Sequence, residues 1–297
     1  MRRTRWTGTA VLIALTACRQ SPAAADGNQN APAAAASASA ATTDFTAPAT
    51  GTTSLVRLAC GTIKVDDFSK RFSDRQLYPH GPKQLTDSCY LITHNGHRLL
   101  WDTGLPLALL NTPHAYGGMT AVLDVALVKQ LAAIGVQPGQ IEMVGISHSH
   151  FDHTGQAVAF PAATLLIGPQ DFDQVKGKDD PFGHWRANGG KITPMPGDHD
   201  MFGDGDVVAL FLPGHTDGHH ALLVKLKSGT VLLSGDLYHA TEARTQRGVP
   251  PFNSDRAQTL TSMDRFERIA KETGAKVIIQ HEPADIAKLP AFPQAAE

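Results

Sequence analysis

The chain has 297 residues and a formal net charge of −2, with 42% hydrophobic and 18% charged residues. This balance is ordinary for a globular protein, and the absence of a basic excess excludes nucleic acid as a partner. The first ~50 residues are much poorer in large apolar side chains than the rest, so one core-forming domain after them is the simplest organisation.

The chain begins with the features of a secretion signal. Residues 1–5 include three arginines, residues 6–17 are mostly apolar, and Leu15-Thr16-Ala17-Cys18 closes the run. A run this short does not span a bilayer, which takes about 20 apolar residues. The closing four residues resemble a bacterial lipobox, which implies that residues 1–18 are a lipoprotein signal ending in a lipidated Cys18. A plain signal peptide is the alternative.

The resemblance also implies a destination. Because Arg19 rather than aspartate follows Cys18, the expected location is the outer membrane of a Gram-negative cell, facing the periplasm, with contact to the membrane through the lipid anchor only. Residues 19–54 are rich in Ala, Ser, Thr, Pro and Gly and are expected to form a flexible tether. Residues 55–297 then form the folded domain.

The pattern of apolar runs in this domain is typical of an α/β protein with several antiparallel connections. Strands are predicted at 55–65, 89–93, 98–101, 141–146, 164–167, 207–212, 221–226, 230–233 and 276–279. His94-Asn95-Gly96-His97 is a good hairpin turn between the second and third of these. Helices are predicted at 121–134, closed by Gly135, and at 255–272, with Ser254 as the N-cap.

Cys60 and Cys89 both lie in apolar, strand-like stretches. In an oxidising compartment they are compatible with a disulfide between neighbouring strands. They are equally compatible with two buried free thiols.

The strongest chemical signal is Ser147-His148-Ser149-His150-Phe151-Asp152-His153, directly after the apolar run 141–146. In an extended segment, residues two apart point the same way, so His148 and His150 can bind one cation. Where the chain turns into a helix, Asp152 and His153 are directed to a second point. Three imidazoles and a carboxylate in one place favour a metal site, because a metal removes the cost of burying them unpaired.

The other isolated histidines are interpreted as surface or hydrogen-bonded polar groups, a set that comprises His80, His94, His97, His114, His184 and His199. His219 and His220 are assigned to strand packing or to support of the site, not to the ligand set.

The His-x-His-x-Asp-His motif resembles the hallmark of the metallo-β-lactamase superfamily, which implies an αββα sandwich with a metal site at one edge. It also implies three further ligands, each after a strand, and the sequence offers His215 after 207–212, Asp236 after 230–233 and His281 after 276–279. The resemblance assigns His148, His150 and His215 to one cation and Asp152, His153 and His281 to another. Asp236 bridges the two.

The segments 85–92 and 99–106 look like the opening hairpin of the N-acyl homoserine lactonase branch, where Asp102 would support the metal loop from behind. A mere cap of the Thr103-Gly104 turn is the alternative for Asp102. The implied reaction is quorum quenching, in which a metal-bridging hydroxide opens the lactone ring. Two divalent ions are expected, zinc by default for His and Asp ligands, with manganese, iron or cobalt as alternatives.

Asp152 is the expected proton carrier beside this hydroxide. The lactonase pattern places a tyrosine three residues after the bridging aspartate, but here that position is His239 and the tyrosine is Tyr238. Either could contact the substrate carbonyl, and the position favours His239.

Other functions are weighed by the residues present. A phosphotriesterase, or another lactonase or esterase, shares all seven ligands and is the main alternative; Asp236 disfavours a β-lactamase, and the sixteen residues after His281 leave no room for the added domain of glyoxalase II. A membrane-tethered metal-binding protein is the non-enzymatic alternative. Residues 171–190, with Phe172, Phe182 and Trp185, are expected to be a surface loop or part of an acyl-chain wall. The partner is a small lactone or ester, and the sequence carries no signal for an oligomeric state.

Overall fold

The computed structural model describes residues 52–297. Cys18, the predicted signal peptide and nearly all of the predicted tether lie outside the described residues. The first strand begins at Thr53 rather than at residue 55, because Thr53 and Ser54 pair with His94 and Thr93 of the neighbouring strand.

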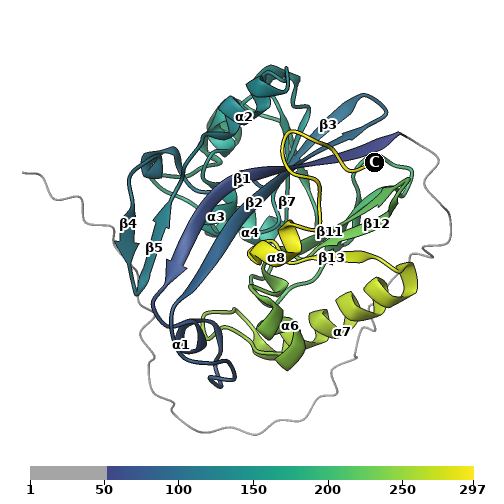
Figure 1. The fold of residues 1–297 in the computed structure, drawn as a ribbon. Coiled ribbons are helices and arrows are strands. Elements are labelled where there is room, and N and C mark those ends of the chain that lie inside the picture. The colour runs from purple at the N-terminus through teal and green to yellow at the C-terminus, as the bar shows by residue number, and fades with distance from the viewer. Residues whose placement is uncertain (1–51) are drawn as a thin grey trace, which may run out of the picture. The chain divides into compact units, whose positions relative to one another are not determined.

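Two sheets form the centre of this domain (Figure 1). The first sheet has the strand order β4-β5-β1-β2-β3-β6-β7-β8, and the second has the order β13-β12-β11-β10-β9. The first consists of β1 (Thr53–Val65), β2 (Lys83–His94), β3 (His97–Trp101), β4 (His114–Tyr116), β5 (Met119–Val122), β6 (Met143–Gly145), β7 (Thr164–Ile167) and β8 (Ile192–Pro194). The second consists of β9 (His199–Asp200), β10 (Val207–Phe211), β11 (His220–Leu226), β12 (Gly229–Leu233) and β13 (Lys276–Ile278).

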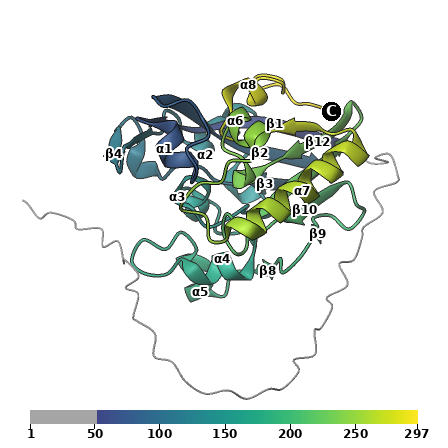
Figure 2. The same ribbon diagram turned by 90° about the horizontal axis from the view of Figure 1, so that it is seen from below.

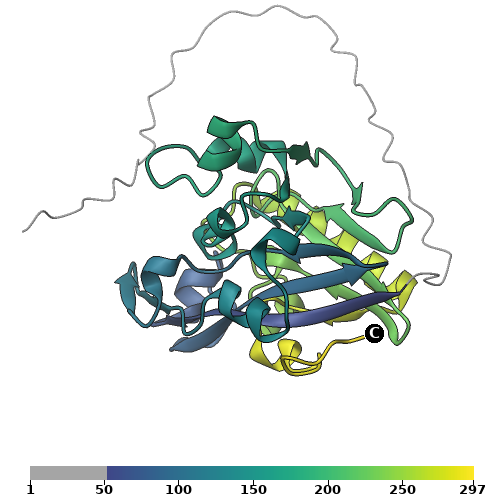
Figure 3. The same cartoon turned by 90° about the horizontal axis from the view of Figure 1, so that it is seen from above.

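Helices cover both outer faces of the sheets. The longest, α7 (Arg256–Thr273), lies along the outer side of the second sheet (Figure 2), and α2 (Leu127–Ala133) lies on the far side of the first, which Figure 3 shows from above. The remaining helices are short: α1 (Phe68–Phe72), α3 (Phe151–Thr154), α4 (Pro169–Gln174), α5 (Gly183–Asn188), α6 (Thr241–Gln246) and α8 (Pro283–Ile286). The predicted αββα sandwich is confirmed.

Three groups of buried apolar side chains hold these layers together. One lies between the sheets and joins Tyr90 and Trp101 of the first sheet to Leu222 and Leu233 of the second. A second packs α2 against the first sheet, and a third packs α7 against the outer face of the second. This burial of apolar surface is the main stabilising contribution.

The helix predicted over 121–134 is wrong in its first half. Ala121 and Val122 belong to β5, which pairs with Thr62 and Ile63 of β1, and α2 begins only at Leu127. The apolar spacing suits a helix, but the edge of β1 offers unpaired backbone groups that residues 119–122 satisfy first. The predicted end is right, since Gly135 follows the helix with φ +76°.

Two other predictions need correction. The N-cap of α7 is Asp255, whose carboxylate accepts a hydrogen bond from the Gln258 N–H, and not Ser254. The segment 171–190 contains most of α4, an exposed loop at 176–179 and α5, so the expected surface loop is only part of it. Phe182 and Trp185 are buried in the core under the first sheet, where the Trp185 indole N–H donates to the Ala163 carbonyl.

Cys60 and Cys89 form a disulfide, which settles the choice that their spacing leaves open. The register between β1 and β2 shifts at Cys60, and this bulge brings the two Cα atoms to 5.8 Å. No helix within residues 52–297 has the length and apolar character needed to cross a membrane.

Candidate metal centre

The predicted ligands come together at one edge of the sandwich. His148 and His150 follow β6, and Asp152 and His153 lie on α3, which continues the same loop. His215 follows β10, Asp236 lies in a 3₁₀ turn (Gly235–Leu237) after β12, and His281 follows β13. Because β12 and β13 are parallel, and β10 runs in the same direction, their carboxyl ends meet at one edge. The sheets thus collect side chains that are far apart in the sequence.

Three imidazoles form the first part of the site. The His148 Nε2 atom lies 3.0 Å from His150 Nδ1 and 3.1 Å from His215 Nε2, and the latter lies 2.9 Å from His150 Nδ1. Ligands bonded to one tetrahedral cation at about 2.1 Å are separated by about 3.4 Å, so this triangle has the size of a metal site. His148 and His215 are buried, and His150 is half-buried.

Asp236 joins this triangle to the second group. Its Oδ2 atom lies 3.6 Å from His148 Nε2 and 3.4 Å from His215 Nε2. Its Oδ1 atom lies 3.1 Å from His153 Nε2 and 2.9 Å from His281 Nε2. The ligand atoms of Asp152, His153 and His281 all lie within 4.8 Å of one another. One carboxylate therefore presents one oxygen to each group, which is the geometry of a bridging ligand.

The residues fit a pair of divalent cations. Asp236 Oδ1 is buried and has no hydrogen-bond partner of acceptable geometry among the described residues. The first three imidazole nitrogens point at one another, and a neutral ring cannot donate to every neighbour in such a triangle. A cation at each position would satisfy all these atoms together.

Burial and charge act differently on the two groups. Burial lowers the pKa of His148 and His150 well below the usual value, so both rings are neutral. Burial also opposes protonation of His281 and His153, but Asp236 raises the pKa of His281 to about 9 and, with Asp102, raises that of His153 well above its usual value. Burial likewise disfavours the Asp236 carboxylate, yet the surrounding histidines hold its pKa well below the usual range.

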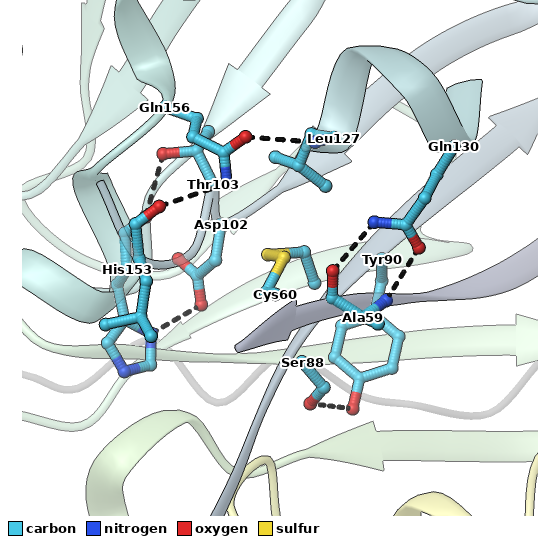
Figure 4. The surroundings of a disulfide bond; sticks show 12 residues. Ala59, Cys60, Ser88, Tyr90, Asp102, Thr103, Leu127, Gln130, His153 and Gln156 are labelled. Carbon is cyan, nitrogen blue, oxygen red and sulfur yellow. Dashed lines mark hydrogen bonds and ion pairs between the residues drawn. A yellow bond between two sulfur atoms is a disulfide. The ribbon is translucent and has the colours of Figure 1, made fainter. Parts of the chain in front are cut away.

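Asp102 supports the metal loop, as predicted from the resemblance, and does more than cap a turn. It is fully buried, its Oδ1 accepts from the Ser147 N–H at 2.7 Å, and its Oδ2 lies 2.9 Å from His153 Nδ1. Figure 4 shows Asp102 and His153 facing each other, with Cys60 beside them. The adjoining Gly104 packs so closely that a Cβ there would lie 2.5 Å from Cys60 Cβ. The disulfide thus packs against the turn at residues 102–104, which positions His153.

Three further residues support the site, and two of them, Asp171 and Asn253, are not evident from the sequence. Asp171 accepts from the hydroxyls of Ser149 and Thr216, both at 2.7 Å, and so ties together the loops of the first three histidines. The Asn253 side-chain oxygen lies 2.9 Å from His215 Nδ1. His219 is a support, as predicted: its Nδ1 donates to the Leu212 carbonyl, and its Nε2 accepts the Asp236 N–H at 2.9 Å.

The two candidates for contact with the substrate point in opposite directions. His239 lies in the site, with Nε2 at 3.0 Å from Asp236 Oδ2 and its ring stacked on His281 at 5.7 Å. The Tyr238 hydroxyl instead donates to Glu267 of α7 at 3.1 Å, so the prediction that included Tyr238 as a catalytic residue is wrong. In an extended chain, neighbouring side chains alternate, and Tyr238 is the one that turns into the core.

Fold and site together define a sandwich protein with paired metal positions at the ends of its strands. The family model of the metallo-beta-lactamase superfamily matches residues 84–281, and the chain belongs to this superfamily.

The chain is similar to proteins that are named N-acyl homoserine lactonases. The N-acyl homoserine lactonase AttM of Azorhizobium caulinodans is 31% identical over 218 residues, which cover 65% of this chain and 81% of the relative. The solved structure of a quorum-quenching N-acyl homoserine lactone hydrolase has a TM-score of 0.71 at 22% identity and covers 84% of this chain and all of its own. The dizinc quorum-quenching lactonase AidC has a TM-score of 0.61 at 17% identity, with 82% and 90% covered.

Proposed function

We propose that this protein is a metal-dependent hydrolase that opens the lactone ring of N-acyl homoserine lactones. The observation that carries the proposal is Asp236, whose two oxygens face separate groups of ligands. A protein that only stores metal has no need of a carboxylate shared between two positions. The lactonase relatives supply the substrate class, since AttM is 31% identical and is a lactonase by name.

Two bound divalent ions would lower the pKa of water so that a nucleophile exists at neutral pH, and they would polarise the carbonyl. Side chains of the protein then accept and donate the proton that is transferred in the reaction. Asp152 lies at the edge of the second ligand group, 3.9 Å from His281 Nε2, where its carboxylate can take up a proton and release it to the departing ring oxygen.

His239 is the group placed to contact the substrate. Burial lowers the pKa of His239 to about 4, so the ring is neutral at pH 7 and carries one N–H donor, which faces Asp236 Oδ2 at 3.0 Å and would become available to the substrate once a cation binds that oxygen. Loss of a donor to a developing oxyanion costs about 100–1,000-fold in kcat. We expect His239→Ala to lose this much, whereas the neighbouring variant Tyr238→Phe, which only loses its contact with Glu267, keeps kcat. Equal losses in both variants would reject the role of His239.

A cavity of about 610 Å³ is lined by Asp66, Asp67, Lys70, Arg71, Gly117, Gly118, Pro251 and Phe252, and none of the predicted ligands lines it. Phe252 lies between this cavity and the metal centre. It lines the cavity, and its ring lies 5.9 Å from the ring of His215 and 6.3 Å from that of His150. A volume of this size suits a small ligand. Phe252 is 41% exposed, and it offers an apolar surface to an acyl chain leaving the metal centre.

The substrate class is tested by offering the purified protein a homoserine lactone, a phosphotriester and a cephalosporin side by side. Lactone turnover that is lost on chelation and restored by metal is the expected result. Turnover of the phosphotriester or the lactam without turnover of the lactone would overturn the assignment.

We propose zinc as the native metal, because histidine and aspartate in a tetrahedral arrangement are typical zinc ligands. Elemental analysis of protein purified without added metal tests this assignment. Manganese, iron or cobalt in place of zinc would contradict it.

We further propose that Cys18 carries a lipid and that the protein is held at the outer membrane, facing the periplasm. The Cys60–Cys89 disulfide supports an oxidising compartment. Mass spectrometry of the mature N-terminus and membrane fractionation of the wild type and of Cys18→Ser test the anchor. Membrane association that survives in Cys18→Ser would reject it.

A further inference from the structure

A second cluster of metal-binding side chains lies at the end of the sandwich opposite the catalytic edge. His94 ends β2, and Asp204 and Asp206 lie in the loop before β10, whereas the catalytic loops follow β6 and β10. One ligand atom from each of these three residues lies within 4.8 Å of the other two. The cluster joins the two sheets, because β2 belongs to the first and β10 to the second.

The loop that carries the two aspartates is shaped before any ligand binds. Asp200 Oδ1 accepts the N–H groups of Phe202 and Gly203, and its Oδ2 accepts that of Gly205 at 2.7 Å. Gly203 and Gly205 have positive φ values of 86° and 78°, which the tight loop requires. Asp200 thus closes the loop, and Asp204 Oδ1 accepts the Asp206 N–H at 3.2 Å, while Asp204 Oδ2 faces His94.

His94 is held from behind in the orientation of a metal ligand. It is only 2% exposed, and its Nδ1 lies 2.8 Å from the Thr53 hydroxyl. Its Nε2 lies 2.6 Å from Asp204 Oδ2 and 2.9 Å from the Asn95 side-chain nitrogen, which a bound cation would displace. Support of one ring nitrogen by a neighbouring oxygen, while the other faces the site, is the usual arrangement of a histidine ligand.

Asp206 supplies an independent sign that the cluster is incomplete. The residue is 3% exposed, and its Oδ2 atom is buried without a hydrogen-bond partner among the described residues. The ammonium group of Lys225 lies on the other side, with Nζ 4.0 Å from Asp206 Oδ1. A buried carboxylate oxygen with no partner is costly. One lysine at this distance does not balance two carboxylates.

We propose that His94, Asp204 and Asp206 bind a third divalent cation of the zinc class, independent of the catalytic pair. One imidazole and two carboxylates provide three ligands, and the exposed side of Asp204 leaves room for water as the fourth. Binding at His94 Nε2 places the ring proton on Nδ1, where it can be donated to the Thr53 hydroxyl, so the neutral ring takes up one cation and keeps its one proton. The cation clamps the two sheets together where β1 begins, next to Thr53.

Metal content per chain is the direct test. Full-length wild type, Asp206→Asn and Asp204→Asn are equilibrated with Zn²⁺, freed of excess and measured by elemental analysis, with lactone hydrolysis as a check that each folds. The expected result is one zinc fewer in each variant, with unchanged turnover. Since the difference between the proteins is measured, it is independent of whether the catalytic pair fills.

Glu142→Gln is the matched control. Glu142 pairs with His97 at 2.8 Å near the same end of the molecule, but both side chains are at least half exposed and no second carboxylate joins them. This variant keeps the wild-type zinc content. Anomalous scattering at the zinc edge in crystals of the wild type locates the ion beside His94. Equal zinc content in wild type, Asp204→Asn and Asp206→Asn, or no anomalous peak at His94, overturns the proposal.

Discussion

The two halves of the metal centre are built from similar ligands but are supported differently. His148, His150 and His215 are positioned by neutral or distant groups: Asn253 contacts His215, and Asp171 acts through two hydroxyls. In the second half, Asp152, His153 and His281, a buried carboxylate positions one ligand, since Asp102 lies 2.9 Å from His153 Nδ1, while His281 Nδ1 lies 3.0 Å from the Thr86 carbonyl.

The difference has an electrostatic consequence. Burial holds the rings of His148 and His150 neutral, ready for a cation. Burial also opposes protonation of His153 and His281, but carboxylates raise the pKa of both, so these rings retain protons until a cation replaces them. The ligands of the first half are therefore positioned by neutral contacts, whereas the protonation of the second half is controlled by carboxylate charge. Variants of the supporting residues can separate these two effects.

The largest effect is expected from Asp236→Ala, which removes the ligand shared by both halves. Loss of an outer partner of a ligand costs about 10–100-fold in metal affinity, and loss of a shared ligand costs more than that at each position. We expect both metals to be lost together, with lactone turnover near background. Calorimetric titration of zinc into the metal-free variant measures this loss. Retention of one tightly bound ion would show that the halves are independent.

The next largest effect is expected from the double variant Cys60→Ala/Cys89→Ala. The disulfide closes a loop with a sequence separation of 29. Removal of a disulfide that closes a loop of this size lowers the free energy of unfolding by about 3–4 kcal/mol. Chemical denaturation measures this change. Because the Cys60 side chain packs against Gly104 in the turn that positions His153, we expect the second metal to bind more weakly while the first is retained. An equal loss at both positions would argue for general destabilisation.

A smaller and more selective effect is expected from Asp102→Ala. Removal of the carboxylate behind His153 should weaken the second metal by about 10–100-fold and leave the first nearly unchanged. Asn253→Ala is the matched variant for the first half, and it should cost less because the lost partner of His215 is neutral and half-buried. Stepwise zinc binding measured by competition with a chelator distinguishes the two, and a reversed pattern would refute this division.

Four of the seven ligands could be predicted from the spacing of the motif itself, because they lie within six residues. The resemblance to the superfamily implied the other three, and the sequence offers His215, Asp236 and His281 after apolar strands. Asp171 and Asn253 could not, since their contacts with Ser149 and His215 span 22 and 38 residues and leave no local pattern. Hydrogen bonds of this kind arise only when the strands are in register.

The errors have the same origin. The spacing of apolar residues over 121–134 suits a helix, but pairing of β5 with β1 decides the structure of its first residues. The choice between Tyr238 and His239 depended on which side chain faces the strand ends, and the contact of Tyr238 with α7 decides it. The spacing of Cys60 and Cys89 in the sequence does not show whether they are bonded. The bulge in β1 brings them close enough to form the disulfide.

The dependence of metal affinity on pH should differ between the two halves of the metal centre. At pH 7 the metal-free protein holds a proton on His281, whose pKa is about 9, and on His153, whose pKa is raised well above its usual value. A second metal must expel these protons, so its affinity should rise by about tenfold per pH unit for each proton released as the pH increases toward 9. His148 and His150 are already neutral, so the affinity for the first metal should change little. Zinc competition titrations between pH 6 and pH 9 measure both slopes.

Asp102→Asn is the control variant. It should flatten only the slope of the second metal, because it removes one of the two carboxylates that raise the pKa of His153. Identical slopes for both metals in the wild type would contradict the electrostatic difference between the halves.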